Sequence, residues 1–310
     1  MACSLPALSR RDVLRGLVAA AAITALPSPA ALAQAGPLTR ELPGSSVALP
    51  RVGLGSWITF NVGEDPVLLE ACTAVMAAFF AEGGRLIDSS PMYGSSQATI
   101  GYALKQLAAV DRVYAADKVW TSNPSEGPAQ IEASRRDWGI PHFDMLQVHN
   151  LLGWEGHLET LMAMKAAGDV RHLGITTSHG RRHDAVEHIM RHVPLDSVQL
   201  TYNIVDRDAE QRLLPLAQER GIGVIANRPF QRKRLIRRLE GKPLPPWAVE
   251  IGADTWAQFI LKFIISHPAV TCAIPATTQV EHVRENLAAA REPLPDETMR
   301  RRMANHVRGL

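Results

Sequence analysis

The stretch Arg85-Leu86-Ile87-Asp88-Ser89-Ser90-Pro91-Met92-Tyr93-Gly94 joins a short apolar run to a polar turn that contains an aspartate, a proline and a tyrosine. Leu86 and Ile87 form a run too short for a helix, and it ends at Asp88, which is typical of a buried strand that leads into a loop. Similar short runs recur along the chain, at residues 52–55, 113–116, 145–148, 173–176, 198–201, 223–226 and 271–274. We therefore predict eight buried strands.

Amphipathic stretches of helical length separate these strands, for example residues 66–82, 99–108, 128–138, 157–167, 209–220, 255–266 and 280–290. Strands that alternate with helices form a parallel sheet, and eight such units within residues 34–310 predict one closed (β/α)8 TIM barrel of the α/β class. An open doubly wound sheet is the alternative, although the first strand lacks the glycine-rich phosphate turn that such sheets usually carry. We expect residues 45–49 to form a hairpin at the barrel floor and residues 231–247 to form a loop over its top.

The first 33 residues have the pattern of an export signal. Arg10-Arg11 precede an apolar run at residues 16–26, which is too short to span a bilayer, and Ala31-Leu32-Ala33 matches a signal-peptidase site. This order resembles a twin-arginine (Tat) signal peptide, so we expect a signal at residues 1–33 and one barrel at residues 34–310. It predicts the Tat translocase as a partner during export, a periplasmic location and no stable membrane span. A misassigned start or an uncleaved anchor is the alternative.

Composition excludes several classes of protein. The 310 residues are 46% hydrophobic and 21% charged, which is enough apolar content for a large core and excludes a disordered chain. Three cysteines, Cys3, Cys72 and Cys272, are too few and too scattered for a disulfide framework or a cysteine-based zinc site. The formal charge of +2 arises in the first 33 residues, so the remainder is neutral overall, which argues against nucleic acid as a partner.

Ionisable residues lie at the ends of three consecutive predicted strands, where a barrel enzyme holds its active site. Asp88 ends the second strand, Lys118 follows the third, His149 follows the fourth, and Tyr93 lies in the loop after Asp88. A free tyrosine has a pKa of about 10 and is a poor acid or base near neutrality. A nearby ammonium lowers that pKa, a carboxylate keeps the ammonium charged, and a histidine can orient a carbonyl. The four residues therefore predict proton donation to a carbonyl oxygen, with no metal required.

Each of the four residues also has a purely structural interpretation. Asp88 could cap the helical turn that follows it, Tyr93 could anchor a loop, and His149 could be a buried histidine bonded to the backbone. Lys118 is harder to explain in this way, because the chain contains only six lysines against 27 arginines. A lysine at this position favours a role for its compact charge and adjustable pKa.

Three segments, in chain order, resemble the aldo-keto reductase family: Asp88-Ser89-Ser90-Pro91-Met92-Tyr93-Gly94, Lys118-Val119-Trp120 and Asp144-Met145-Leu146-Gln147-Val148-His149. The similarity extends over residues 52–286, which is nearly the whole chain after the predicted signal. The resemblance implies a (β/α)8 barrel in which a nicotinamide cofactor reduces an aldehyde or ketone to an alcohol.

The resemblance assigns a role to each of the four ionisable residues. Tyr93 matches the proton donor, Lys118 and Asp88 match the residues that tune it, and His149 matches the residue that orients the carbonyl.

The resemblance also implies a binding site for NADPH or NADH. Residues 174–177 occupy the place of the family's Gly-Val-Ser-Asn motif, which holds the carboxamide, and Gln199 matches the glutamine that completes this contact. Residues 274–286 resemble the segment that binds the adenosine phosphate. The cofactor-binding residues expected on this basis are Gly55, Trp57, Thr176, Thr177, Gln199, Arg228, Thr277, Arg284 and Asn286.

The sequence departs from the family at the phosphate and stacking positions. Ala276 stands where many members have lysine, and His282 replaces the arginine that often binds the 2′-phosphate, which should weaken a preference for NADPH over NADH. After the seventh strand, Asn227-Arg228-Pro229-Phe230 replaces Tyr-Ser-Pro-Leu, so the aromatic ring that stacks on the nicotinamide is lost or moved. Arg228 and the basic residues 232–234 could hold the pyrophosphate instead, or they could form a solvated basic loop.

Aromatic residues in the loops at the predicted mouth favour an apolar pocket for a small-molecule carbonyl substrate: Trp57, Phe60, Trp120 and Trp154. One or two of these rings could instead pack against the loops themselves.

Two other functions stay open at the level of sequence. An exported protein meets no pool that regenerates nicotinamide, so a non-catalytic barrel that binds a nucleotide or another ligand, as a sensor or subunit, is the main alternative. A lyase that forms a Schiff base through Lys118 is the other.

Overall fold

The computed structural model describes residues 36–310, so the expected signal peptide at residues 1–33 lies outside the described part of the chain. Within residues 36–310, no helix combines the length and the apolar character needed to cross a bilayer.

Eight parallel strands form a single sheet in which neighbours in space are neighbours in the chain. The first and last strands are joined as well, since the backbone N–H of Gly53 donates to Ala273 O at 2.8 Å and that of Ala273 donates to Arg51 O at 2.9 Å. The sheet is therefore closed, which confirms the predicted (β/α)8 barrel and excludes the open doubly wound sheet. The strands are β3 (Leu54–Gly55), β4 (Leu86–Asp88), β5 (Tyr114–Val119), β6 (Phe143–Val148), β7 (Val170–Thr176), β8 (Ser197–Thr201), β9 (Gly223–Asn227) and β10 (Val270–Ala273).

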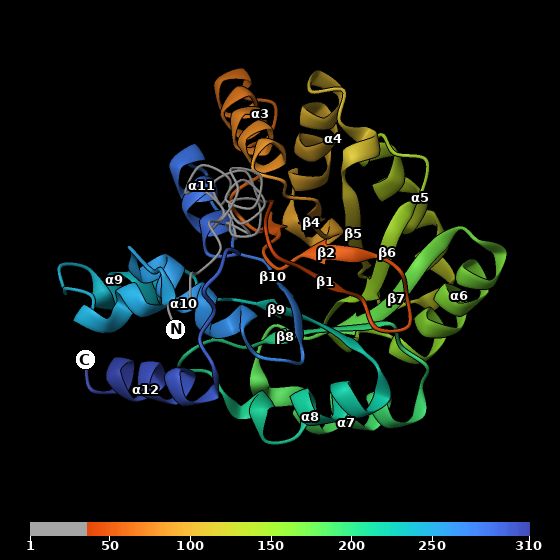
Figure 1. Cartoon of the computed structure of the whole chain (residues 1–310). Helices are drawn as coiled ribbons and strands as arrows, with labels where there is room; N and C mark the ends of the chain where they lie inside the picture. The colour runs from red at the N-terminus through yellow and green to blue at the C-terminus, as the bar shows by residue number, and fades with distance from the viewer. Residues whose placement is uncertain (1–35) are drawn as a thin grey trace, which may run out of the picture. The chain divides into compact units, whose positions relative to one another are not determined.

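Helices surround the strands in a ring (Figure 1). The first of them begins where the sequence predicts, because the Asp65 carboxylate accepts hydrogen bonds from the backbone N–H groups of Val67 at 2.9 Å and Leu68 at 3.1 Å. The helices of the ring are α3 (Pro66–Ala81), α4 (Ser96–Gln106), α5 (Gly127–Trp138), α6 (Trp154–Ala167), α7 (His183–His192), α8 (Leu213–Arg220), α10 (Trp256–Ile265) and α11 (Val280–Ala288). Helices α9 (Arg234–Leu239) and α12 (Glu297–Arg308) are additional to it.

A β-hairpin covers the floor of the barrel, as expected from residues 45–49. Strands β1 (Thr39–Glu41) and β2 (Ala48–Pro50) pair in antiparallel register. Leu42 and Leu49 are fully buried, and they belong to a hydrophobic cluster with inward-facing residues of the barrel strands. The hairpin therefore excludes water from the lower half of the barrel interior.

The two-residue period of the strands divides the barrel interior into an apolar floor and a polar top. Leu86 and Asp88 point to the same side of β4, because alternate residues of a strand face the same way. Along β5, Tyr114 belongs to the floor cluster and Lys118, four residues later, lies at the top. The same order places Met145 in the floor, below Gln147 of the top. Apolar packing thus supports a ring of polar side chains.

Two segments differ from the sequence-based expectation. Residues 231–247 are not a simple loop, since α9 lies within them and buries Leu235 and Leu239. These leucines are hard to recognise as a helical stripe among five basic residues. Helix α7 is not among the expected helices, although Val186, Ile189 and Met190 show the i, i+3, i+4 spacing of a buried face.

We expect Leu42→Ala to lower the free energy of unfolding by about 2–5 kcal/mol, because it opens a cavity under the barrel. The Leu42 side chain fills the space beside Gly223, where an added Cβ would lie only 2.3 Å from Leu42 Cδ1. Equilibrium urea unfolding measures the change. Val249→Ala is the matched control, because Val249 is 77% exposed. Equal effects of the two substitutions would show that the hairpin does not contribute to the core.

Candidate active site

A buried ion pair lies at the centre of the polar top of the barrel. Lys118 Nζ donates to both carboxylate oxygens of Asp88, at 2.7 and 2.8 Å, and to the backbone oxygen of Ser89 at 2.6 Å. The side chains of Lys118 and Asp88 are 0% and 4% exposed. Burial lowers the pKa of the Lys118 ammonium, but Asp88, together with Tyr93 and Asp117, outweighs this effect and the resulting pKa is above the ordinary value. Lys118 is therefore charged at neutral pH.

Asp88 is not the helix cap that the structural interpretation suggested. Its Oδ1 also accepts a hydrogen bond from Gln199 Nε2 at 2.7 Å, and Gln199 Nε2 lies 3.2 Å from Gln147 Oε1. The cap of the following 3₁₀ turn, Pro91–Tyr93, is instead Ser90, whose hydroxyl accepts from the backbone N–H of Met92. The hydrogen-bond partners of the Asp88 carboxylate thus lie in the interior of the barrel.

Tyr93 lies above this ion pair. Its ring is 5.3 Å from Lys118 Nζ and packs edge-on against the ring of His149, with 5.7 Å between the ring centroids. Burial raises the pKa of the Tyr93 hydroxyl, and Asp88 adds to this, whereas Lys118 opposes it. As expected from the sequence, the interaction with Lys118, taken alone, lowers the pKa of Tyr93. Burial has the larger effect, so Tyr93 is protonated at neutral pH.

His149 is held by a side chain and not by the backbone. Its Nδ1 lies 2.7 Å from Ser90 Oγ, and among the described residues the Ser90 hydroxyl has no other acceptor for its proton. Ser90 therefore donates to Nδ1, which places the imidazole proton on Nε2. Burial, with a smaller contribution from Lys118, lowers the pKa of His149 to about 3. A neutral imidazole with a proton on Nε2 can donate a hydrogen bond to a carbonyl oxygen.

These side chains face a cavity of about 420 Å³ at the mouth of the barrel. Asp88, Tyr93 and His149 all line it, whereas Lys118 lies beneath them. Five of the expected cofactor-binding residues line it as well, namely Gly55, Trp57, Thr176, Gln199 and Arg228. The expected catalytic residues and one part of the expected cofactor site are therefore together.

The inner end of the cavity fits a carboxamide. Gln199 Oε1 lies 3.5 Å from Thr176 Oγ1 and 3.4 Å from Asn227 Nδ2, both of which are long contacts. Asn227 Nδ2 also donates to the backbone oxygen of Thr177 at 2.9 Å. These amide and hydroxyl groups can exchange such contacts for the donors and the acceptor of a nicotinamide carboxamide. Thr177 itself is fully buried and contributes its backbone here.

The loop after β9 is basic and has a strained backbone. Positive φ angles occur at Arg228 (52°), Gln231 (49°), Arg232 (56°) and Lys233 (69°), a conformation that non-glycine residues adopt rarely. The guanidinium of Arg232 lies over the ring of Trp57, 4.2 Å from its centroid. This contact connects the loop after β9 to the loop after β3, across the cavity. The basic side chains suit the negative charge of a pyrophosphate.

The residues expected at the adenosine end lie beyond β10, at α11. Thr277 and Asn286 are buried, and Thr277 Oγ1 lies 3.3 Å from His282 Nδ1. Arg284 is exposed, and its guanidinium makes no hydrogen bond or ion pair with another described residue. The structure does not bring these residues to the cavity of the catalytic side chains. They lie on its β10 side, where Ala276 is part of the lining.

The aromatic residues expected at the substrate pocket do not all reach it. Trp57 lines the cavity, but Phe60 is 0% exposed and belongs to the hydrophobic core, so the assignment of Phe60 to the pocket is wrong. Trp120 is 39% exposed with its ring 6.4 Å from His149, and Trp154 packs against the core at the start of α6. Neither is among the lining residues.

Several lining residues were missed in the sequence, among them Asn227, Phe230 and Met92. Asn227 ends β9 just as Asp88 ends β4, and this position could have identified it. Phe230, two residues before a cluster of charges, supplies an aromatic ring on the same loop. Met92 had no recognisable signal. Within residues 36–310, no three His, Cys, Asp or Glu side chains are grouped in a way that could hold a metal ion.

We expect His149→Asn to reduce the acid sensitivity of folding. The unfolded chain binds a proton at this histidine below about pH 6.5, whereas the folded protein binds it only near pH 3, so acidification through this range destabilises the wild type. Between about pH 5.5 and pH 4, the variant should lose about 1.4 kcal/mol less unfolding free energy per pH unit. Urea unfolding at several pH values measures this. His188→Asn, on the exposed face of α7, is the control, and an equal effect there would contradict the assignment.

Comparison with known proteins adds an independent test of the fold and the family. A model of the Aldo/keto reductase family matches residues 51–304. Methylglyoxal reductase YeaE of Escherichia coli (strain K12) is 28% identical over 253 residues, which cover 78% of this chain and 86% of that protein. An NADH-specific methylglyoxal reductase of the same organism is 24% identical over a region that covers 84% of this chain and 96% of that protein.

Solved structures share the barrel. The crystal structure of an aldo/keto reductase from Klebsiella pneumoniae in complex with NADP and acetate superposes with a TM-score of 0.70 at 24% sequence identity, over 88% of this chain and 96% of the other. The family match spans most of the chain, including all eight strands of the barrel. The protein described here therefore belongs to the aldo/keto reductase family.

Proposed function

We propose that this protein is an oxidoreductase that uses NADPH or NADH to reduce an aldehyde or ketone to an alcohol. The observation that carries the proposal is the arrangement of Asp88, Lys118, Tyr93 and His149. A buried ion pair lies directly under a protonated tyrosine, beside a neutral histidine, at the wall of one cavity. A nicotinamide, when bound, supplies the hydride that adds to the carbonyl carbon.

Three side chains divide the work at the carbonyl oxygen. Nε2–H of His149 orients this oxygen by a hydrogen bond, and the Tyr93 hydroxyl donates the proton that the oxygen needs as the alcohol forms. The ammonium of Lys118 then stabilises the tyrosinate. Asp88 keeps Lys118 charged, so the tyrosine and the lysine titrate as a coupled pair. Burial beneath the cavity strengthens each of these interactions, because water does not screen them.

The residues that would hold the cofactor lie between β7 and α11. Thr176, Gln199 and Asn227 would contact the carboxamide, with the backbone of Thr177 behind them. Arg228, Arg232 and Lys233, which line the cavity of the catalytic residues, would contact the pyrophosphate, with Gly55 and Trp57 opposite. Beyond β10, the adenosine end would contact Thr277, Arg284 and Asn286.

Both NADPH and NADH are compatible with this site. Ala276 and His282 remove two cationic contacts to a 2′-phosphate, whereas the exposed Arg284 can supply one. Related proteins use either cofactor, since one solved relative is described with NADP and one curated relative as NADH-specific. Two curated relatives are methylglyoxal reductases, so methylglyoxal is a suitable first substrate to assay.

The two alternative functions are less compatible with the geometry. A lysine needs a neutral amine to form a Schiff base, but Lys118 is tied to Asp88 in a buried ion pair that keeps it protonated. A non-catalytic barrel would have no need for a complete proton-donating arrangement. Activity of a Tyr93 variant separates this second alternative from a reductase.

We expect Tyr93→Phe to reduce kcat for carbonyl reduction by at least about 10²-fold, because the proton donor is removed. Lys118→Met should reduce kcat with little change in the Kd of the cofactor. Protein from Gln34 onward is assayed with NADPH and NADH, and cofactor binding is followed by tryptophan fluorescence. Tyr102→Phe is the control, because the Tyr102 hydroxyl contacts Glu70 on the outer helices.

Cofactor binding and turnover separate the outcomes. Saturable binding of either nicotinamide with Tyr93-dependent reduction supports the proposal. Binding with no dependence on Tyr93 would favour the non-catalytic barrel. If neither cofactor bound, the differences after β9 and β10 would have abolished the site. A loss of cofactor affinity equal to the loss of kcat in Lys118→Met would contradict the role given to Lys118.

We further propose that residues 1–33 are a Tat signal that directs the mature barrel at residues 34–310 to the periplasm. The support is the order of Arg10-Arg11, the apolar run at residues 16–26 and the site ending at Ala33. Tat substrates cross the membrane folded, which suits a protein that binds its cofactor before export.

We expect the double substitution Arg10→Lys and Arg11→Lys to leave the protein in the cytoplasm of a bacterial host with a functional Tat translocase. Immunoblots of periplasmic and cytoplasmic fractions measure the distribution. Arg15→Lys is the matched control in the same segment. Periplasmic protein from the double variant, or from a host without the translocase, would refute the Tat assignment.

A further inference from the structure

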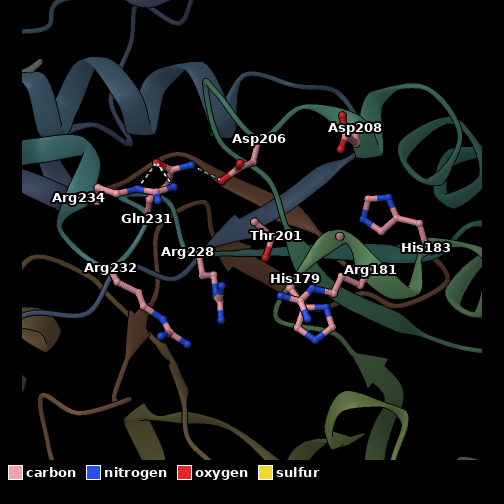
Figure 2. Close-up of a pocket in the computed structure, with 11 residues that line it drawn as sticks. His179, Arg181, His183, Thr201, Asp206, Asp208, Arg228, Gln231, Arg232 and Arg234 are labelled. Carbon is pink, nitrogen blue, oxygen red and sulfur yellow. Dashed lines mark hydrogen bonds between the residues drawn. The ribbon is translucent and has the colours of Figure 1, made fainter. Parts of the chain in front are cut away.

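A second cavity, of about 700 Å³, lies beside the cavity of the catalytic residues. The loops that follow β7, β8 and β9 form it, and Figure 2 shows side chains from all three loops around it. Arg228 and Arg232 line both cavities. The two cavities therefore adjoin at Arg228 and Arg232, and carbonyl reduction itself does not require the second one.

The second cavity is positively charged. Four arginines line it against two aspartates, Asp206 and Asp208, which leaves a net charge of +2 with the histidines neutral. Asp206 Oδ2 accepts hydrogen bonds from Asn203 Nδ2 at 2.8 Å and Gln231 Nε2 at 2.7 Å, so side-chain amides bind this carboxylate and no arginine pairs with it among the described residues. The cavity therefore attracts anions.

Polar groups of this cavity lack partners within the described part of the chain. The guanidinium groups of Arg228 and Arg181 make no hydrogen bond or ion pair with any residue in 36–310, and Nδ1 of His179 is buried without a partner. Figure 2 shows Arg228 on one side of the cavity and His179 with Arg181 on the other. Burial of the Arg228 guanidinium and the nearby charge of Arg232 both lower the pKa of Arg228. A bound anion would offset these two effects, because it favours the charged form of the guanidinium. The guanidinium groups of Arg228 and Arg181 therefore offer free donors from opposite sides of the cavity.

The order of the strands distinguishes this anion from the cofactor. A dinucleotide that runs from Gln199 on β8 to Asn286 on α11 passes β9 and then β10. His179 and Arg181 follow β7, on the opposite side of β8. They therefore lie off the path of the cofactor, whereas Arg228 lies at the boundary between the two.

We propose that the second cavity binds the anionic tail of the substrate, so that the substrate is an aldehyde or ketone that carries a carboxylate or phosphate at its far end. This inference rests on the proposed carbonyl reduction. The carbonyl lies at Tyr93 and His149, the chain passes Arg228, and the anion contacts the guanidinium of Arg181, beside His179. Arg181 is then a specificity-determining residue outside the catalytic and cofactor sites.

The test compares substrates that differ only in their tail. Linear aldehydes of four to ten carbons are assayed as n-alkanals, as ω-oxo carboxylates and as ω-oxoalkyl phosphates of equal length. At one optimal length, kcat/KM for an anionic substrate should exceed that of the alkanal by about tenfold, the effect of one charge-assisted contact. Arg181→Gln should remove this advantage through KM and leave the alkanal unchanged. Arg220→Gln, at the exposed end of α8, controls for the loss of one positive charge.

Each outcome bears on one proposal. Equal reduction of neutral and anionic aldehydes at every length would overturn the anionic subsite but leave carbonyl reduction intact. A weaker Kd for NADPH in Arg181→Gln would assign the cavity to the cofactor and would also overturn it. If no aldehyde were reduced, carbonyl reduction itself would fail. In that case, calorimetry with dicarboxylic acid monoamides of four to ten carbons, in which an amide replaces the aldehyde and the carboxylate is kept, would test the cavity directly. The anionic subsite would be rejected if no monoamide bound in a way that depended on Arg181.

Discussion

The ion pair between Lys118 and Asp88 is the constraint on which the active site depends. An ammonium that is fully buried must have a carboxylate and further hydrogen bonds, because an isolated charge in the interior is far less stable than in water. Asp88 supplies the charge, and the Ser89 carbonyl and the Gln199 amide complete the network. The apolar floor below, closed by the hairpin, keeps water away from this network. Removal of either partner would leave the other charge unpaired and would cost about 3–5 kcal/mol.

The barrel and its ion pair could be predicted from sequence because both follow from local rules. Buried parallel strands appear as short apolar runs, and a polar residue at the end of such a run faces the mouth of the barrel. The bond from Ser90 to His149 could not be predicted, since the Pro91–Tyr93 turn determines where Ser90 points. Phe60 was misassigned for a related reason. A loop can direct an aromatic ring into the core as readily as into a pocket.

Strain is concentrated in the loop after β9, where four non-glycine residues have positive φ angles. Each such residue costs on the order of 1–3 kcal/mol, which surrounding contacts must offset. The stacking of Arg232 on Trp57 and the hydrogen bonds of Gln231 to Asp206 and Arg234 are contacts of this kind. This loop also separates the two cavities, so the most strained backbone in the described part of the chain lies where ligands meet.

The pairing of Lys118 with Asp88, together with a neutral His149, makes the catalytic centre electrically neutral overall. This centre therefore contributes almost no long-range field at the mouth of the barrel, and the charged residues of the loops contribute most of it. Loops tolerate substitution far more readily than barrel strands. The electrostatic capture of ligands, and with it the sensitivity of association rates to ionic strength, can therefore evolve in this scaffold without any change to the residues that perform the proton transfer.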